Sequence, residues 1–169
     1  MAVENKYINA DIVAGKKAVA AFVQGAELFV AMTTFETAAA DDDGSVYRLF
    51  KSVNPHYIPV KIDVTNDAIT SGTDWDLGLY LPSKDGVDGA VINKDIFADG
   101  MDLSSAHLRT AALDGLVTVD AASSLKRIYE HAGDTLATRE LGYDIALTAN
   151  TVGSAIGTIT VVAYFVYGG

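Results

Sequence analysis

The stretch that decides the fold class runs from Asp74 to Leu81 and reads Asp-Trp-Asp-Leu-Gly-Leu-Tyr-Leu. Large apolar residues, among them the only tryptophan of the chain, alternate there with aspartate, glycine and tyrosine. Since successive side chains of a strand point to opposite faces of a sheet, the alternation predicts a core strand with one buried and one wetter face. On this interpretation Trp75 anchors the core, and Asp74 and Asp76 face solvent at the entrance of the strand.

Strand patterns recur along the chain. The predicted strands are Leu28–Phe35, Val46–Phe50, Ile58–Val64, Asp74–Leu81, Tyr143–Ala149 and Thr158–Tyr167. The first is apolar at both parities, which predicts burial on two faces. The turn residues between Ile58–Val64 and Asp74–Leu81 predict that these two strands are antiparallel neighbours, and the last two strands are expected to form a hairpin.

The region between the central and the closing strands is harder to interpret. Residues 90–92 are expected to form a short edge strand, and residues 94–113 irregular structure with a helical turn or two. Asp120 to Ala132 has apolar residues at three- and four-residue spacing, with Asp120 as N-cap and Gly133 as terminator, and therefore predicts one short helix.

These elements predict an all-β protein, an antiparallel β-sandwich of jelly-roll type with one short helix. The 169 residues fit one domain. We assign the sandwich to residues 18–169, preceded by an N-terminal arm or leading loop over residues 1–17. Glu4 and Asp11 argue against a cleaved signal peptide. The most apolar segment, Ile159–Tyr167, is about half the ~20 residues that a membrane-spanning helix needs.

Charge and composition exclude several classes of partner. The chain has 12 basic and 22 acidic residues, a net charge of -10 and no cysteine. A strongly acidic protein repels phosphate backbones and anionic headgroups, so we expect neither nucleic acid nor membrane as a partner. Without cysteine there is no disulfide framework and no thiolate nucleophile.

No residue set predicts catalysis, cofactor binding or a metal site. None of His56, His107 and His131 has a second ligand at metal-binding spacing. No nucleophile elbow or phosphate-binding glycine loop occurs. The contiguous acids Asp41–Asp43 before Gly44 form either a solvated turn or a calcium loop, and the absence of alternate spacing and of a closing glutamate favours the turn. We therefore predict a protein that is not an enzyme and has no cofactor.

Two carbohydrate hypotheses stay open at this stage. Asp74 and Asp76 could act as an acid pair in a sugar cleft. Several tyrosines of the predicted strands could line a carbohydrate platform or simply be ordinary strand residues; they are Tyr47, Tyr57, Tyr80 and Tyr143.

The closing strand suggests a contact surface. From Val162 onward it is apolar or aromatic at both parities, so that a second layer or another subunit must cover its outer face. The candidate subunit-contact residues are Tyr164, Phe165, Val166 and Tyr167.

Three stretches together resemble virion structural proteins of tailed bacteriophages, most closely capsid decoration (cement) proteins. They are Thr34–Thr37 continuing into Asp41–Arg48, Asp67–Tyr80 and Gly142–Thr151. The resemblance implies a non-enzymatic protein on the outer capsid surface that contacts the major capsid protein and its own copies, as a trimer by analogy. It carries no functional residues over. The alternatives are a carbohydrate-binding or adhesin-like module and a tail or neck component of the virion.

Overall fold

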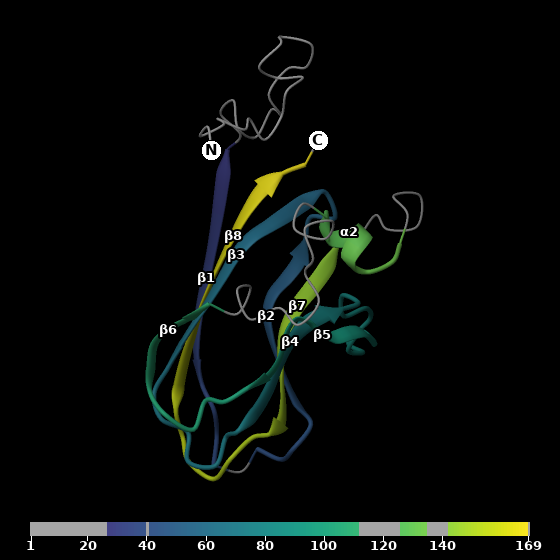
Figure 1. Cartoon of the computed structure of the whole chain (residues 1–169). Helices are drawn as coiled ribbons and strands as arrows, with labels where there is room; N and C mark the ends of the chain where they lie inside the picture. The colour runs from purple at the N-terminus through teal and green to yellow at the C-terminus, as the bar shows by residue number, and fades with distance from the viewer. Residues whose placement is uncertain (1–26, 40, 112–125, 135–141, 169) are drawn as a thin grey trace, which may run out of the picture.

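The computed structural model describes residues 27–39, 41–111, 126–134 and 142–168. They form eight strands and one short helix, shown in Figure 1. The elements are β1 (Leu28–Glu36), β2 (Ser45–Val53), β3 (Tyr57–Asn66), β4 (Asp74–Tyr80), β5 (Val91–Met101), β6 (His107–Ala111), α2 (Ile128–His131), β7 (Tyr143–Thr151) and β8 (Thr158–Tyr167).

The strands form two four-stranded sheets packed face to face. One sheet has the order β1-β8-β3-β6 and the other β2-β7-β4-β5, and the pairs within each sheet are antiparallel. The first four strands pair in order with the last four in reverse order: β1 with β8, β2 with β7, β3 with β6 and β4 with β5. This nested pairing, divided between two packed sheets, is the topology of an eight-stranded jelly roll. The predicted all-β jelly-roll sandwich is therefore confirmed.

The predicted pairing of consecutive strands is wrong in two places. β3 and β4 lie in different sheets, and so do β7 and β8. The loops 67–73 and 152–157 cross from one sheet to the other at the lower end of Figure 1. Ile69 of the first loop is fully buried, and the Ser154 N–H of the second loop donates to the Thr70 carbonyl of the first at 2.9 Å. Loops of this length can close a hairpin or span the ~10 Å between packed sheets, so their turn residues do not distinguish the two.

The core lies between the sheets and is centred on β4 as predicted. Trp75, Leu77 and Leu79 have no exposed surface, and the Tyr47 ring stacks on Trp75 at 5.6 Å between centroids. The other face of β4 is buried too, which contradicts the expected wetter face: Asp76 is 1% exposed and Tyr80 5%.

An irregular β5 covers that second face of β4. The pairing slips between Leu77↔Ala98 and Leu79↔Asn93, so the β5 chain bulges across its neighbour. Gly78 marks the closest approach, because a Cβ built on it would lie 2.1 Å from the Asn93 carbonyl oxygen. Only glycine leaves room for a backbone at that distance.

The region between β4 and β7 differs most from the prediction. β5 has eleven residues in place of a short edge strand, and β6 lies where irregular structure was expected. The described part of the predicted helix is a single turn, α2, whose N-cap is Arg127; the Arg127 N–H donates to the Glu130 carboxylate at 2.7 Å. Gly133 follows with φ 74° as predicted.

Some predictions fall on residues outside the described ranges. Asp120 is one of these residues, and so are the expected arm over residues 1–17 and the start of the domain at residue 18. Within the described ranges no helix combines the length and apolar character needed to cross a membrane.

Candidate interaction surface

The histidines are not assembled into a reactive site. The His56 ring packs against the rings of Tyr129 and Tyr167, the His107 Nδ1 lies 3.1 Å from the Asn66 amide oxygen, and His131 packs edge-on against Phe97. In the described part of the chain, no group of three or more histidines, aspartates or glutamates is placed to hold a metal ion.

The Asp41–Asp43 segment has the hydrogen bonds of a turn. The Asp41 carboxylate accepts from the Ala38 N–H at 2.8 Å and from the Tyr47 hydroxyl at 2.5 Å. The bond from Tyr47, followed by that from Ala38, lowers the pKa of Asp41. Asp43 accepts from the Val152 N–H at 2.9 Å. Two of the three carboxylates thus tie the turn to the sandwich, and Gly44 has φ 90°, the positive value that the turn interpretation predicts.

Asp74 and Asp76 form a structural network rather than a cleft. Asp76, expected to face solvent, is 1% exposed; its carboxylate binds the Lys94 ammonium at 3.0 Å and accepts from the Asn150 amide at 2.7 Å and from the Gly100 N–H at 3.0 Å. Burial alone would raise the pKa of Asp76, but these donors outweigh it, so that its pKa lies below the ordinary value. The Asn150 amide also donates to Asp74 at 3.0 Å.

The four tyrosines do not form an exposed platform. Tyr143 is fully buried and Tyr80 is 5% exposed, with its hydroxyl on the Thr148 hydroxyl. Tyr57 stacks with Phe29, and Tyr47 stacks on the core. The four tyrosines are therefore packed as ordinary strand residues. Their rings do not form the exposed platform that the carbohydrate-binding hypothesis requires.

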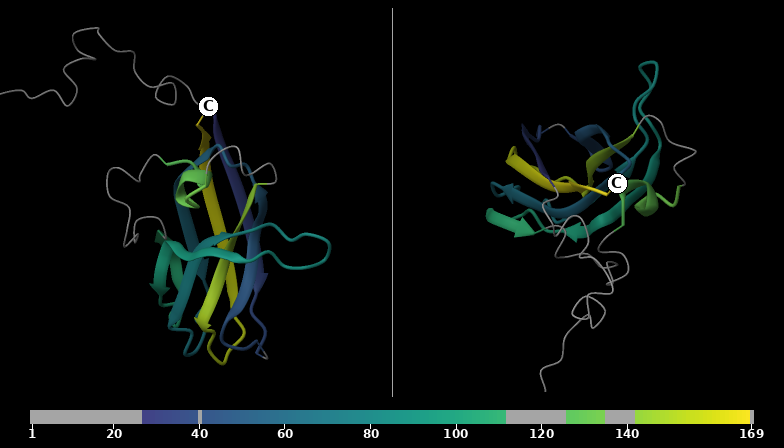
Figure 2. Two further views of the ribbon diagram at one scale, coloured as in Figure 1. Left: turned by 90° about the vertical axis from the view of Figure 1, so that its right-hand side faces the viewer. Right: turned by 90° about the horizontal axis from the view of Figure 1, so that it is seen from above.

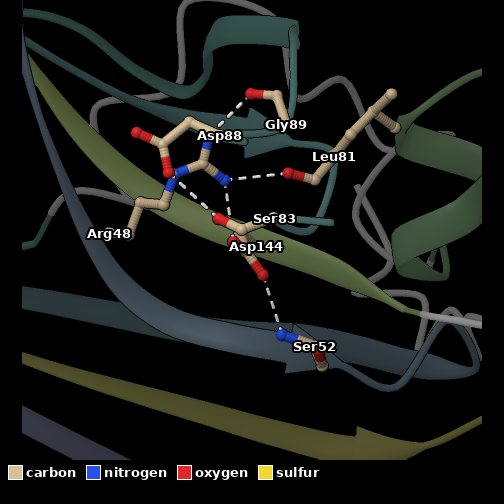
Figure 3. A network of polar contacts seen from close by, with 7 residues as sticks. All are labelled: Arg48, Ser52, Leu81, Ser83, Asp88, Gly89 and Asp144. Atoms are coloured by element: carbon tan, nitrogen blue, oxygen red, sulfur yellow. Dashed lines mark hydrogen bonds and ion pairs between the residues drawn. The ribbon is translucent and has the colours of Figure 1, made fainter. Parts of the chain in front are cut away.

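A buried ion pair, not foreseen from the sequence, holds the connection between β4 and β5 (Figure 3). The Arg48 guanidinium on β2 donates to the Asp144 carboxylate on β7 at 2.7 Å, to the Leu81 carbonyl at 2.8 Å and to the Gly89 carbonyl at 2.6 Å. The Ser52 N–H donates to the second oxygen of Asp144 at 2.9 Å. Arg48 therefore fixes both ends of the loop that projects from the sandwich in Figure 2.

The outer face of β1 and β8 is an apolar surface made of directly paired residues. Leu28, Val30 and Met32 are 54%, 57% and 70% exposed. They lie directly opposite the outward residues of β8 in the pairs Leu28↔Val166, Val30↔Tyr164 and Met32↔Val162. We call these six residues the β1–β8 face.

This face contradicts the prediction that β1 is buried on both sides. The residues of β1 alternate strictly between exposed and partly buried. Contiguous apolar surface of this kind on a folded protein usually marks a site of protein contact. The β1–β8 face is therefore the candidate interaction surface.

The four candidate contact residues of β8 divide between two faces. Tyr164 and Val166 belong to the β1–β8 face, whereas Phe165 is 3% exposed and packs in the core. Tyr167 is 49% exposed and lies against His56 at the end of the strand. Alternation along the strand explains the division, and the role of these residues in subunit contact stays a prediction.

Comparison with known proteins identifies the fold. No family model matches the sequence, and no curated protein matches it. A chain from the capsid of Ralstonia phage GP4 aligns with a TM-score of 0.54 and 16% identity over 83% of this chain and 86% of that one. A chain from the capsid asymmetric unit of cyanophage Pam1 aligns with a TM-score of 0.51 and 12% identity over 85% and 86%. At these identities the likeness shows a shared fold.

Proposed function

We propose that this chain is a structural protein of a bacteriophage virion and that it decorates the outer surface of the capsid. The observation that carries the proposal is the fold shared with chains from two phage capsids, each aligned over most of its length. Because the aligned fraction is nearly equal on both sides, those chains and this one are similar in size. The resemblance of three sequence stretches to decoration proteins points to the same role.

The charge and the surface agree with a position outside the shell. A net charge of -10 disfavours contact with packaged nucleic acid. The β1–β8 face offers apolar contact area on a regular sheet, with a tyrosine, Tyr164, at its centre. Tyrosine is among the residues enriched where protein interfaces gain their binding energy. We assign this face to contacts with the major capsid protein or with further copies of the chain, in a homo-oligomer that we expect to be a trimer.

The experiment uses shells assembled without this protein from the coat protein of the same virion. Purified parent protein should bind them and sediment with them, and Met32→Asp should weaken that binding at least about tenfold, since a charge at a buried contact must be desolvated. Leu108→Asp is the matched control, because Leu108 is 96% exposed on β6 at the opposite edge of the same sheet.

Three results are informative. Equal binding by Met32→Asp and Leu108→Asp would remove the β1–β8 face from the proposal. Failure of the parent to bind shells would remove the decorating role. Binding to isolated tails or necks instead would move the chain to another part of the virion. Light scattering on the purified protein measures the oligomeric state.

A further inference from the structure

The loop between β4 and β5 is itself a small hairpin that projects from the sandwich (Figure 2). Lys84 and Val87 exchange both backbone hydrogen bonds at 2.9 Å, and the two residues between them, Asp85 and Gly86, have φ values of 53° and 80°. Positive φ at both central residues is typical of a type I′ turn, whose twist matches that of two paired strands. We call residues 82–89 the β4–β5 hairpin.

The base of this hairpin is held in place from two sides. The Leu81 N–H donates to the Ala90 carbonyl at 2.9 Å, and the Arg48 guanidinium donates to the Leu81 and Gly89 carbonyls at 2.8 and 2.6 Å. At the tip, Val87 is 70% exposed. A loop that is already ordered loses little conformational entropy when it binds a partner. The hairpin therefore presents an exposed apolar side chain at the end of a preorganised arm.

A groove at one side of the sandwich is the complementary feature. It separates β1 from β2, which have no second neighbour among the described strands, and it has a volume of about 450 Å³. Three aromatic rings form a stack along it, with Phe29 on Tyr57 at 5.0 Å and Tyr57 on Phe165 at 5.7 Å. Leu49 of β2 also lines the groove, and Lys51 is the only charged side chain among the described residues that line it. We call it the β1–β2 groove.

The tip of the hairpin and the groove match in width and in charge. Two paired strands lie about 4.8 Å apart and two packed sheets about 10 Å apart, so a two-stranded tip fits between the edges of two sheets. Val87 supplies an apolar side chain for the aromatic stack. The hairpin carries two acids, Asp85 and Asp88, and one base, Lys84. Its net negative charge is opposite to that of Lys51, the charged residue of the groove.

The hairpin does not occupy the groove of its own chain. Asp88 and Gly89 line a separate recess together with residues of β2, and the tip projects away from the sandwich. We propose that the β4–β5 hairpin of one copy docks in the β1–β2 groove of a second copy, with Val87 against the aromatic stack and Asp85 beside Lys51. Each chain offers one hairpin and one groove. Head-to-tail contacts of this kind close into rings such as the expected trimer.

The inference rests on the homo-oligomer of the proposed function and not on the decorating role. The contact uses surfaces other than the β1–β8 face, so the two can be tested separately. Self-association of the purified protein reports the hairpin contact, and binding to shells reports the decorating role.

Sedimentation velocity of the full-length chain over a range of concentrations tests the contact. The parent should associate, and Val87→Asp should weaken that association at least about tenfold, because a charge would enter an apolar groove. Lys51→Glu should weaken it too, since it would meet Asp85 with like charge. Leu108→Asp, an apolar-to-acidic change at a residue of β6 that is 96% exposed, should associate as the parent does. The fluorescence of the buried Trp75 checks that each variant is folded.

Mixing the two defective variants distinguishes a hairpin in a groove from an interface of two identical patches. Val87→Asp keeps an intact groove, and Lys51→Glu keeps an intact hairpin. Together they should therefore associate at least about tenfold more tightly than either variant does with itself. Mixing does not repair an interface in which both copies contribute the same damaged patch.

Three results would overturn the inference. They are a parent that stays monomeric at every concentration, a Val87→Asp variant that associates as the parent does, and a mixture that associates no better than its two components. A monomeric parent that still binds shells would remove this contact and leave the decorating role. An oligomer that depends on Val87 but does not bind shells would support the contact and remove the decorating role.

Discussion

Replacing Arg48 by methionine removes the cation of the buried ion pair while keeping most of the side-chain volume. The Arg48 side chain is 11% exposed and that of Asp144 1%. Without the guanidinium, the Asp144 carboxylate keeps, among the described residues, the hydrogen bond from the Ser52 N–H at 2.9 Å. A buried carboxylate in that state is poorly compensated, because one amide hydrogen bond does not replace a paired charge.

The expected loss follows from this geometry. Removing one member of a buried pair costs about 3–5 kcal/mol of unfolding free energy, so Arg48→Met should fall in that range. Asp144→Asn keeps the shape and an acceptor oxygen, and should cost only about 1–2 kcal/mol. In the double variant no uncompensated charge remains, so adding Asp144→Asn to Arg48→Met should restore about 1–3 kcal/mol.

Equilibrium unfolding in urea measures all four proteins. Trp75 is the only tryptophan and is fully buried, so its fluorescence reports the loss of the core. The decisive quantity is the coupling energy of the double-mutant cycle. If the two single losses add to within about 0.5 kcal/mol, the pair is not energetically coupled and the reasoning is refuted. A double variant less stable than Arg48→Met would refute it as well.

Three further perturbations test other parts of the fold. Trp75→Ala should cost about 3–5 kcal/mol, because the whole ring is buried; urea unfolding followed by circular dichroism measures it, and a loss below about 1 kcal/mol would contradict the assignment. The donors around Asp76 hold its pKa below the ordinary value in spite of burial. The ionised Asp76 therefore stabilises the fold at pH values above its unfolded pKa of about 3.9, and this contribution is lost as the pH falls toward its folded pKa. Asp76→Asn should therefore be less stable at pH 7 and lose less stability on acidification than the parent, and stability curves that run parallel from pH 7 down to about pH 2 would contradict this. Gly78→Ala should cost about 1–3 kcal/mol or more, since its Cβ would meet the Asn93 carbonyl at 2.1 Å and a backbone obstacle cannot rotate away; an unchanged melting temperature would be the contrary result.

The accuracy of the strand predictions depends on how cleanly side chains alternate. Asp74–Leu81 and Tyr143–Ala149 alternate clearly and correspond to β4 and β7. β5 carries polar residues at successive positions from Asn93 to Asp95 and bulges over β4, so no period of two is visible in it. Its eleven residues were therefore interpreted as an edge strand followed by irregular structure.

The candidate surface was only partly visible in the sequence. The apolar outer residues of β8 were recognised as needing a cover, but their partners Leu28, Val30 and Met32 were assigned to a strand buried on two faces. Both interpretations follow from apolar residues at both parities. The position of β1 at an edge of the sheet, which exposes one of its faces within the described structure, depends on the pairing of all the strands.

The sequence by itself determined the all-β class, the central place of Trp75 and the strongly acidic charge, because alternation and composition are local or additive properties. The tertiary structure alone decided which strands share a sheet. It also decided that Asp76 and Asp144 are buried acids. Each buried carboxylate depends on a donor from another strand. Asp76 binds Lys94 of β5, and Asp144 binds Arg48 of β2, which lies 96 residues earlier in the chain. Long-range contacts of this kind leave no local period in the chain, so their effects become visible only when the sheets are assembled.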